Sequence, residues 1–387
     1  MFKAYRLGGL LLLAASTAQA VDVPAVLPGL NTQIDRAYPA LEKLYKELHQ
    51  NPELAFQEVK TSARLAAEMR SLGFTVTEGI GKTGVVAIYR NGPGPTVMVR
   101  TDMDGLPMEE KTGLPYASRV KTTWNGQETF VAHSCGHDVH MAAWVGTARA
   151  LLALKNQWSG TLMFVAQPAE EALNGAQAMM DDGLYEKFGT PAYVLALHND
   201  GKPAGMVGYD SGPVTTFADG LEITFKGVGA HGSAPHAGID PILIASRFVV
   251  DVQSVVSRER DPREFGVVTV GAFQGGSAGN IIPDNVLLRG TIRSLNAKVR
   301  EKLLAGIKRT AEAVVSMAGA PAADIKLTPG AKAVVNDAAL VAKTAPVFRA
   351  AFGDKAMVQP FTTASEDFSV YGQDGKVPLL FFFVGAQ

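Results

Sequence analysis

The stretch TLMFVAQPAEEALNGAQAMMDDGLYEKFGTPAYVLAL, residues 161–197, holds two short apolar runs separated by a segment with helical spacing. The runs at 161–166 and 193–197 are typical of buried strands, and the segment between them predicts a helix over 176–184. Strands that alternate with helices indicate an α/β layer with some parallel sheet. This stretch therefore predicts an α/β fold class.

The same alternation continues on both sides of this stretch, but the order of elements changes after Phe217. Residues 217–328 predict the order β-α-β-β-α-β of a ferredoxin-like module. We therefore expect a larger α/β domain of residues 21–216 plus 329–387, interrupted by a smaller inserted α+β domain at 217–328. The expected helices lie at 30–50, 65–73, 138–154, 241–256, 297–317 and 337–352, and the expected strands at 85–89, 96–99, 221–225, 267–273, 286–292, 323–327 and 378–384.

Composition limits the classes of protein to consider. The chain has 387 residues, 47% of them hydrophobic, which suits two globular domains of about 150 residues or more and excludes a disordered chain. Its formal net charge of −1 argues against a protein that binds nucleic acid through phosphate neutralisation. A single cysteine, Cys135, excludes an intramolecular disulfide. Seven histidines are present, and none follows His236.

The first 20 residues have the pattern of a secretory signal peptide. Lys3 and Arg6 give a positive start, an apolar run follows at 7–15, and Ala18-Gln-Ala20 is a small-residue cleavage site. A buried amphipathic first helix is the alternative interpretation. We expect an exported protein, periplasmic or secreted, with no membrane segment after cleavage. Loss of the two cations would take the net charge to −1 − 2 = −3.

Two glycine-rich motifs suggest other chemistries, and neither has the context it needs. Residues 227–232 match a dinucleotide fingerprint, but Pro235 and Pro241 follow, so no helix begins at the third glycine to receive a pyrophosphate. Residues 275–279 match a nucleophile elbow, but no histidine follows Ser277 to complete the triad. A serine hydrolase is therefore only the third choice, and glycine-rich turns explain both motifs.

A group of metal-ligating side chains is the stronger signal. Cys135 and His137 are two residues apart, so both can face one side of an extended segment and bind the same metal. Glu170 and Glu171 follow the strand at 161–166, where one carboxylate can bind a metal and the other act as a base. His198 ends the strand at 193–197, and ligands bind at the carboxyl ends of strands in open α/β sheets.

These residues lie in motifs that resemble a known family. From about Leu44 to the last residue, the sequence is similar to metal-dependent amidohydrolases that include hippurate hydrolases, N-acyl-amino-acid and auxin-conjugate hydrolases and related carboxypeptidases, a group of aminoacylase-like dinuclear metallopeptidases. The matching stretches, in order, are HQNPE at 49–53, RTDMDGLP at 100–107, HSCGHDVH at 133–140, QPAEE at 167–171, LHN at 197–199, GAHGSAPH at 229–236, GNIIP at 279–283, GTIR at 290–293 and SEDF at 365–368.

The resemblance implies a catalytic domain that holds two divalent metal ions, zinc or manganese, with cobalt or nickel as alternatives. It implies a smaller inserted lid that also mediates dimerisation, so we expect a homodimer. The implied site residues are the ligands Cys135, His137, Glu171 and His198, the general base Glu170, the lid residue His231 as oxyanion stabiliser, Asn280 and Arg293 for the substrate carboxylate, and Asp102 to orient a ligand. His140 is expected to support a ligand or to pack, and His49 and His133 to be hydrogen-bonded structural histidines.

The implied reaction is metal-dependent hydrolysis of an amide bond in an N-acyl amino acid or small peptide. The family has a further histidine ligand after its last Phe-rich strand, and this sequence ends at 381–387 without one. We therefore expect the second metal to be held weakly and activity to be reduced. A non-catalytic metal- or ligand-binding relative is the alternative function.

Overall fold

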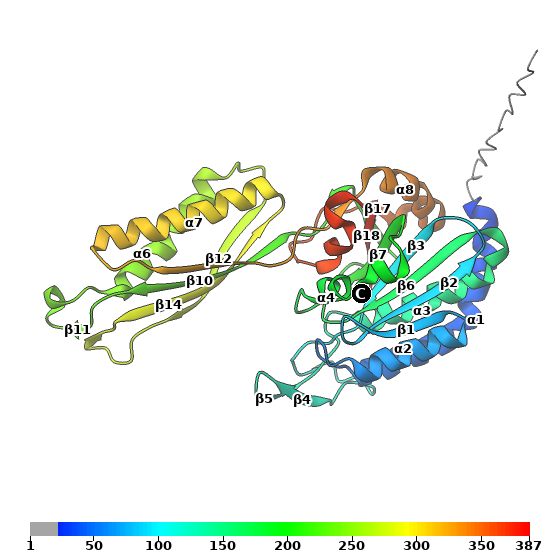
Figure 1. Cartoon of the computed structure of the whole chain (residues 1–387), viewed down its shortest axis with the longest axis horizontal. Coiled ribbons are helices and arrows are strands. Elements are labelled where there is room, and N and C mark those ends of the chain that lie inside the picture. Colours follow the sequence, from blue (N-terminus) through cyan, green and yellow to red (C-terminus); the bar gives the residue numbers. More distant parts are fainter. Residues whose placement is uncertain (1–21) are drawn as a thin grey trace, which may run out of the picture.

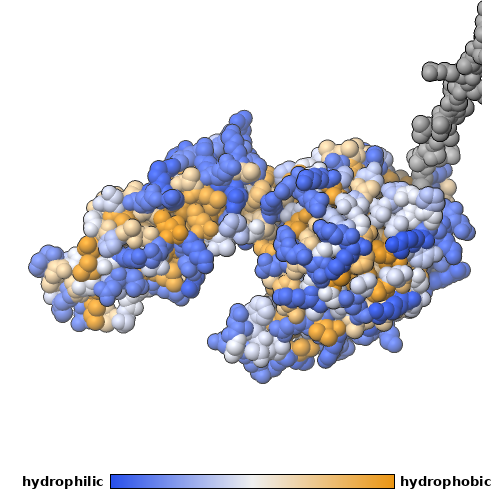
Figure 2. All heavy atoms as spheres, viewed as in Figure 1, coloured by the Kyte–Doolittle hydropathy of each residue, from blue (hydrophilic) through white to orange (hydrophobic). Residues whose placement is uncertain are grey.

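The computed structural model describes residues 22–387, so the signal peptide expected at 1–20 lies outside the described residues. Figure 1 shows two lobes joined by extended segments. The space-filling view shows an open notch between the lobes (Figure 2). None of the helices described between residues 22 and 387 combines the length and apolar character needed to cross a bilayer.

The larger lobe is built on an eight-stranded mixed sheet with the order β1-β2-β6-β3-β7-β18-β8-β17. The four central strands β6, β3, β7 and β18 are mutually parallel. The strand bounds are β1 Thr75–Ile80, β2 Gly84–Asn91, β3 Thr96–Asp102, β6 Gly160–Gln167, β7 Tyr193–Asp200, β8 Val207–Tyr209, β17 Ala356–Val358 and β18 Leu379–Gly385.

Helices cover both faces of this sheet. On one face, Val85 and Phe164 pack with residues of α1 (Val23–Gln50), α2 (Val59–Ser71) and α3 (His137–Ala153). On the other, Val86 and Val165 pack with α4 (Gly175–Asp181), α5 (Leu184–Phe188) and the 3₁₀ segment Asp367–Gly375. Because both faces are buried, the central strands are continuous apolar runs, as the sequence indicated. The last helix, α8 (Ala338–Phe352), packs against β8 and β18.

The smaller lobe, which we call the lid, is a four-stranded antiparallel sheet with the order β12-β14-β10-β15. Its helices α6 and α7 pack on one face around Phe225 and Phe248. This strand order is that of a ferredoxin-like module. The bounds are β10 Phe217–Lys226, α6 Pro241–Ser254, β12 Gly266–Gln274, β14 Asn285–Ser294, α7 Ala297–Ala318 and β15 Asp324–Pro329. The expected α/β class with an inserted α+β lid is confirmed.

The structure also corrects the sequence predictions. The single helix expected at 176–184 is two helices, because Gly183 adopts a left-handed conformation with φ of 78° and ends the first one. The first helix begins at Val23 rather than at Leu30. Short elements were not expected: the hairpin β4 Lys121–Trp124 with β5 Gln127–Phe130, β1, β8, β17, and the two-residue strands β9 Gly212–Pro213, β11 Ala230–His231, β13 Ile281–Ile282 and β16 Val335–Asn336.

Candidate metal centre

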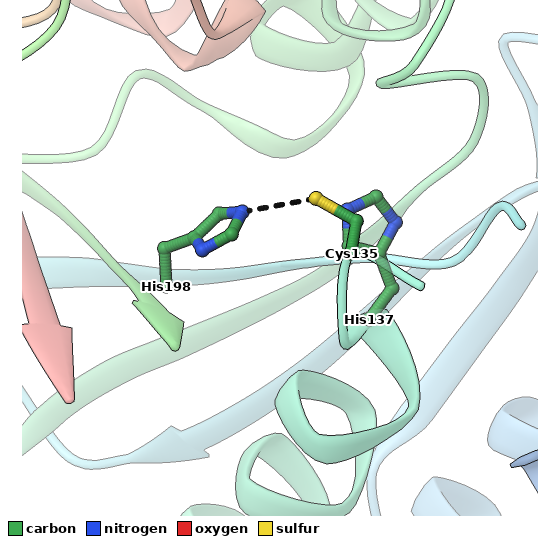
Figure 3. A group of neighbouring side chains, drawn as sticks. All are labelled: Cys135, His137 and His198. Carbon is green, nitrogen blue, oxygen red and sulfur yellow. Dashed lines mark hydrogen bonds between the residues drawn. The ribbon is translucent and has the colours of Figure 1, made fainter. Parts of the chain in front are cut away.

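The turn before α3 presents Cys135 and His137 to the sheet. Gly136 between them caps the helix in a left-handed conformation with φ of 85°. A Cβ at this position would lie 2.5 Å from the side chain of Asn199, so only glycine fits this turn. Figure 3 shows the Cys135 sulfur directed at the ring of His198, with 3.4 Å between Sγ and Nε2. The turn and strand β7 (Tyr193–Asp200) therefore bring a thiol and two imidazoles close together.

Two further candidate ligands reach this point because neighbouring strands end at one edge of the sheet. Strand β6 lies parallel to β3, and β3 lies parallel to β7. Glu170 and Glu171 come shortly after β6, and His198 lies near the end of β7. The Nε2 atom of His137 is 3.8 Å from a carboxylate oxygen of Glu170 and 3.8 Å from one of Glu171. The topology thus assembles the predicted set.

The donor atoms fit a metal ion. The donors of Cys135, His137 and His198 lie within 4.8 Å of one another, as do those of His137, Glu170 and Glu171. Within residues 22–387, both ring nitrogens of His137 and one oxygen of Glu171 are buried without a hydrogen-bond partner. Buried polar atoms are rarely left without one. A soft thiolate with imidazole and carboxylate donors suits zinc and similar divalent ions, which would supply the missing partner.

Asp104, which the sequence analysis did not single out, positions the two glutamates. Its carboxylate accepts the backbone N–H groups of Glu170 and Glu171, each at 3.0 Å. One of its oxygens also lies 3.4 Å from Nδ1 of His137. Ala169, just before the pair, has a left-handed φ of 51°, which is uncommon for a residue other than glycine. A carboxylate beside the second nitrogen of an imidazole ligand orients the ring, so Asp104 shares the role that we expected of Asp102.

Asp102 lies on the other side of His137, 3.7 Å from Nε2. One of its oxygens is 2.7 Å from Nδ1 of His140, and the backbone N–H of Asn199 donates to Nε2 of the same ring. His140 therefore links the end of β3 to the end of β7. This placement agrees with a supporting role for both residues.

A buried arginine lies behind the two glutamates. Arg100 donates to Asp102 at 2.7 Å and to Glu366 at 2.8 Å, and it also contacts Asp367 at 3.5 Å. Gln167 accepts from Arg100 as well. Glu366 and Asp367 belong to the SEDF motif, to which the sequence analysis gave no role. The pairing spans 266 positions, so no local pattern could have revealed it.

Burial controls the ionisation of these groups. Burial and then the charge of Glu366 raise the pKa of Glu170 well above its ordinary value, and the same two causes raise the pKa of Asp367 to about 8. Burial also raises the pKa of Cys135, so a thiolate there needs a nearby positive charge. Burial and next His140 lower the pKa of His198 to about 3, which keeps its ring neutral and able to bind a metal.

A cavity of about 510 Å³ lies beside four of these residues, and its lining includes Cys135, Glu170, Glu171 and His198. Residues of the segment 357–365 also line it. This size is in the range of small-molecule sites.

Comparison with known proteins agrees with this geometry. The model of peptidase family M20/M25/M40 matches residues 98–387. The chain belongs to this family. N-acetyl-L-cysteine deacetylase of Bacillus subtilis is 38% identical over 348 residues, which cover 88% of this chain and 79% of that protein. Hippurate hydrolase of Campylobacter jejuni is 40% identical over 262 residues, which cover 67% of this chain and 66% of that one.

A solved structure gives the same result for the fold. The crystal structure of a dinuclear metal-binding M20 peptidase from Bacillus subtilis superposes with a TM-score of 0.75 at 29% identity, covering 92% of this chain and 89% of that one. The family resemblance seen in the sequence is therefore confirmed, as is its assignment to hydrolases of amide and peptide bonds. The non-catalytic alternative finds no support, because these relatives are named as a deacetylase, a hydrolase and a peptidase.

The three lid residues predicted for this M20 site do not lie at the metal centre. His231 is exposed in β11, at the lid end far from the large sheet (Figure 1). The carbonyl of Asn280 accepts from Gly232, so Asn280 lies beside it. Arg293 lies opposite Ala218, at the other end of the lid. Eight residues of β14 separate Arg293 from the lid tip, about 26 Å of strand. The structure thus brings together the ligands and Glu170, but not this lid set.

The remaining histidines divide into two cases. His49 is hydrogen-bonded as expected, with 2.6 Å between Nδ1 and Asp138. The prediction for His133 was wrong, because within the described chain both of its ring nitrogens are buried without a partner. Burial lowers the pKa of His133 to about 4, so it remains neutral.

Proposed function

We propose that this M20-family protein hydrolyses an amide bond in N-acyl amino acids or small peptides and holds two divalent metal ions, zinc or manganese, in doing so. The observation that carries the proposal is the convergence of Cys135, His137, Glu171 and His198 beside a buried carboxylate, Glu170, at the mouth of a cavity. The named activities of the relatives point to the same class of substrate.

Each residue then has a task in the reaction. The ligands are Cys135, His137, Glu171 and His198, and the bound ions supply polarisation of the amide carbonyl and a lowered pKa for water. Glu170 takes the proton from the attacking water and later delivers it to the leaving amine nitrogen. The raised pKa of Glu170 suits it to hold a proton between these two steps. Asp104 keeps both glutamates in place through their backbone N–H groups.

The lid supplies the groups that meet the rest of the substrate. His231 would stabilise the oxyanion, and Asn280 and Arg293 would hold the substrate carboxylate. Because His231 and Arg293 lie at opposite ends of the lid, they cannot both reach one metal centre of the same chain by a single closure. The proposed homodimer removes this conflict, because a second copy can bring its own lid tip to the site.

The reaction is tested by adding N-benzoylglycine, N-acetylcysteine and a dipeptide to the protein loaded with zinc or manganese. Release of the free amino acid is expected with either metal. It is expected to stop when a chelator is added, because the metal ions are what activates the attacking water in the proposed reaction. Inductively coupled plasma mass spectrometry would count the bound ions. Metal-independent hydrolysis of all three substrates would refute the proposal.

The His231→Ala variant is expected to lower kcat by about 10²- to 10³-fold while metal content stays unchanged, because an oxyanion donor contributes about 2.7–4 kcal/mol to the transition state. The matched control is His236→Ala, which also removes an exposed lid histidine. Steady-state kinetics on both variants makes the comparison. Equal kcat values in the two variants would remove His231 from the mechanism.

We also propose that the protein is exported after removal of residues 1–20. The pattern of positive, apolar and small residues at the start of the sequence supports this. N-terminal sequencing of the mature protein tests it, and a mature chain that still starts at Met1 would refute it.

A further inference from the structure

Phe361 lines the same cavity as the candidate metal ligands Cys135 and His198. It lies in the segment 357–365, which contributes several residues to the cavity wall. Its side chain is half-buried, so part of the ring is available to a bound molecule. The same wall includes Met357 and Pro360. The cavity therefore offers both metal ligands and apolar surface to a bound molecule.

The segment that carries Phe361 is hydrogen-bonded to the strand that leads into the lid. The backbone N–H of Thr362 donates to the carbonyl of Val214 at 2.9 Å, and that of Thr216 donates to the carbonyl of Ala364 at 3.0 Å. The hydroxyl of Thr216 also donates to the carbonyl of Thr363 at 3.0 Å. Strand β10 begins at Phe217, directly after Thr216. Hydrogen bonds therefore join the cavity wall to the segment that leads into the lid.

A lid residue also contacts the ring of Phe361. Phe265 comes just before β12, and its ring centroid lies 5.2 Å from that of Phe361 with the planes at 63°. This is an edge-to-face pair, a geometry that stabilises two aromatic rings beyond their buried area. Phe265 is half-buried, like its partner. The base of the lid therefore holds one wall of the metal cavity.

We propose that Phe361, held in place by Phe265, is the residue that selects the acyl group of the substrate. This inference rests on the proposed hydrolysis of N-acyl amino acids. If the scissile carbonyl of the substrate lies at the metal ligands, the carboxylate of its amino-acid part needs a positively charged side chain as a partner. Of the residues that line this cavity, the only cation is Lys202, which is paired with Asp200 at 2.6 Å. The apolar wall thus suits the acyl half.

An exposed aromatic face stabilises a flat ring more than a methyl group, because it offers more contact area and ring-to-ring attraction. The wall therefore favours an aromatic acyl group over acetyl. Because Phe265 belongs to the lid, a change in lid orientation moves or releases the ring of Phe361. Acyl preference then depends on the position of the lid, although the lid contributes no atom to this wall of the cavity.

Binding of the product acids tests the inference without relying on turnover. Dissociation constants for benzoate and acetate are measured by ligand-observed NMR titration of the full-length zinc-loaded protein. The wild-type protein is expected to bind benzoate more tightly. The preference for benzoate is expressed as the dissociation constant of acetate divided by that of benzoate. Phe361→Leu is expected to reduce this ratio by about 2- to 10-fold. Phe265→Leu is expected to reduce it by a smaller factor.

Phe273→Leu is the matched control, because Phe273 is an exposed lid phenylalanine outside the cavity. It is expected to leave the ratio unchanged. Thermal unfolding identifies any variant that fails to fold, and Phe361→Met then replaces Phe361→Leu. An unchanged ratio in folded variants of both Phe361 and Phe265, or no preference for benzoate in the wild type, would overturn the inference. Benzoate preference without hydrolysis of any substrate would instead refute the proposed function alone.

Discussion

The Glu170→Gln variant is expected to lose hydrolysis by about 10²- to 10⁴-fold and to keep its bound metal. Glutamine has the shape of glutamate, but its amide cannot take a proton from water or return one to the leaving amine. The side chain is only 7% exposed, so bulk water cannot readily replace it. Turnover of an N-acyl amino acid and metal content, measured on the same preparation, are the two readouts.

The adjacent carboxylate provides the matched control. Glu171→Gln makes the same chemical change one residue away, but one oxygen of Glu171 is buried without a partner in the described structure, as expected of a metal ligand. It is therefore expected to lose metal affinity together with activity. If Glu170→Gln lost metal and Glu171→Gln kept it, the two roles would be reversed. Near-normal turnover in Glu170→Gln would exclude it as the base.

Glu170 and Glu171, to which we assign different roles, are held by the same carboxylate, Asp104. It accepts the backbone N–H groups of both residues, which fixes the main chain from which the two side chains extend. Burial and then the charge of Asp104 raise the pKa of Glu171, whereas burial and then the charge of Glu366 raise the pKa of Glu170 well above its ordinary value. Identical residues at consecutive positions thus acquire different chemistry from their surroundings.

The fold was largely predictable where the pattern is local and strong. The runs that became β6 and β7 are long, apolar and flanked by turn residues, so their periodicity identified them. The three-residue strands β8 and β17 have no such pattern, because β8 pairs with β18 and β17 pairs with β8, and both pairings join distant parts of the chain. The break at Gly183 was missed because apolar spacing continues across it, while the backbone conformation of one glycine decides it.

The candidate site divides in the same way. The ligands could be predicted because strand ends in an open α/β sheet converge, and Glu171 and His198 lie at two such ends. Asp104 and Arg100 could not be assigned, since Glu170 lies 66 positions from Asp104 and Glu366 lies 266 positions from Arg100. The lid residues show the limit of resemblance: His231, Asn280 and Arg293 match motifs of the family, yet one chain does not bring them to its own metal centre.

The Arg100→Met variant is expected to lose about 3–5 kcal/mol of unfolding free energy. Arg100 is the cation of a fully buried cluster that holds Asp102, Glu366 and Asp367. Methionine fills a similar volume but removes the guanidinium charge from the buried carboxylates of Asp102 and Glu366. The cost of a buried unpaired charge greatly exceeds the value of the original pair, because the low-dielectric surroundings cannot solvate it. Urea denaturation in the presence of a chelator measures the change without a contribution from bound metal.

Arg90→Met is the control, because Arg90 is exposed near the end of β2, and it is expected to change the unfolding free energy by about 0.5 kcal/mol or less. Arg100→Lys keeps the charge but cannot reach Asp102 and Glu366 with a planar fork, so an intermediate loss is expected. An unfolding free energy that is lowest for Arg100→Met, higher for Arg100→Lys and highest for the wild type would show that the charge accounts for most of the effect. If Arg100→Met cost no more than the surface control, the carboxylates must be protonated together in the folded protein, and Arg100 would serve packing alone.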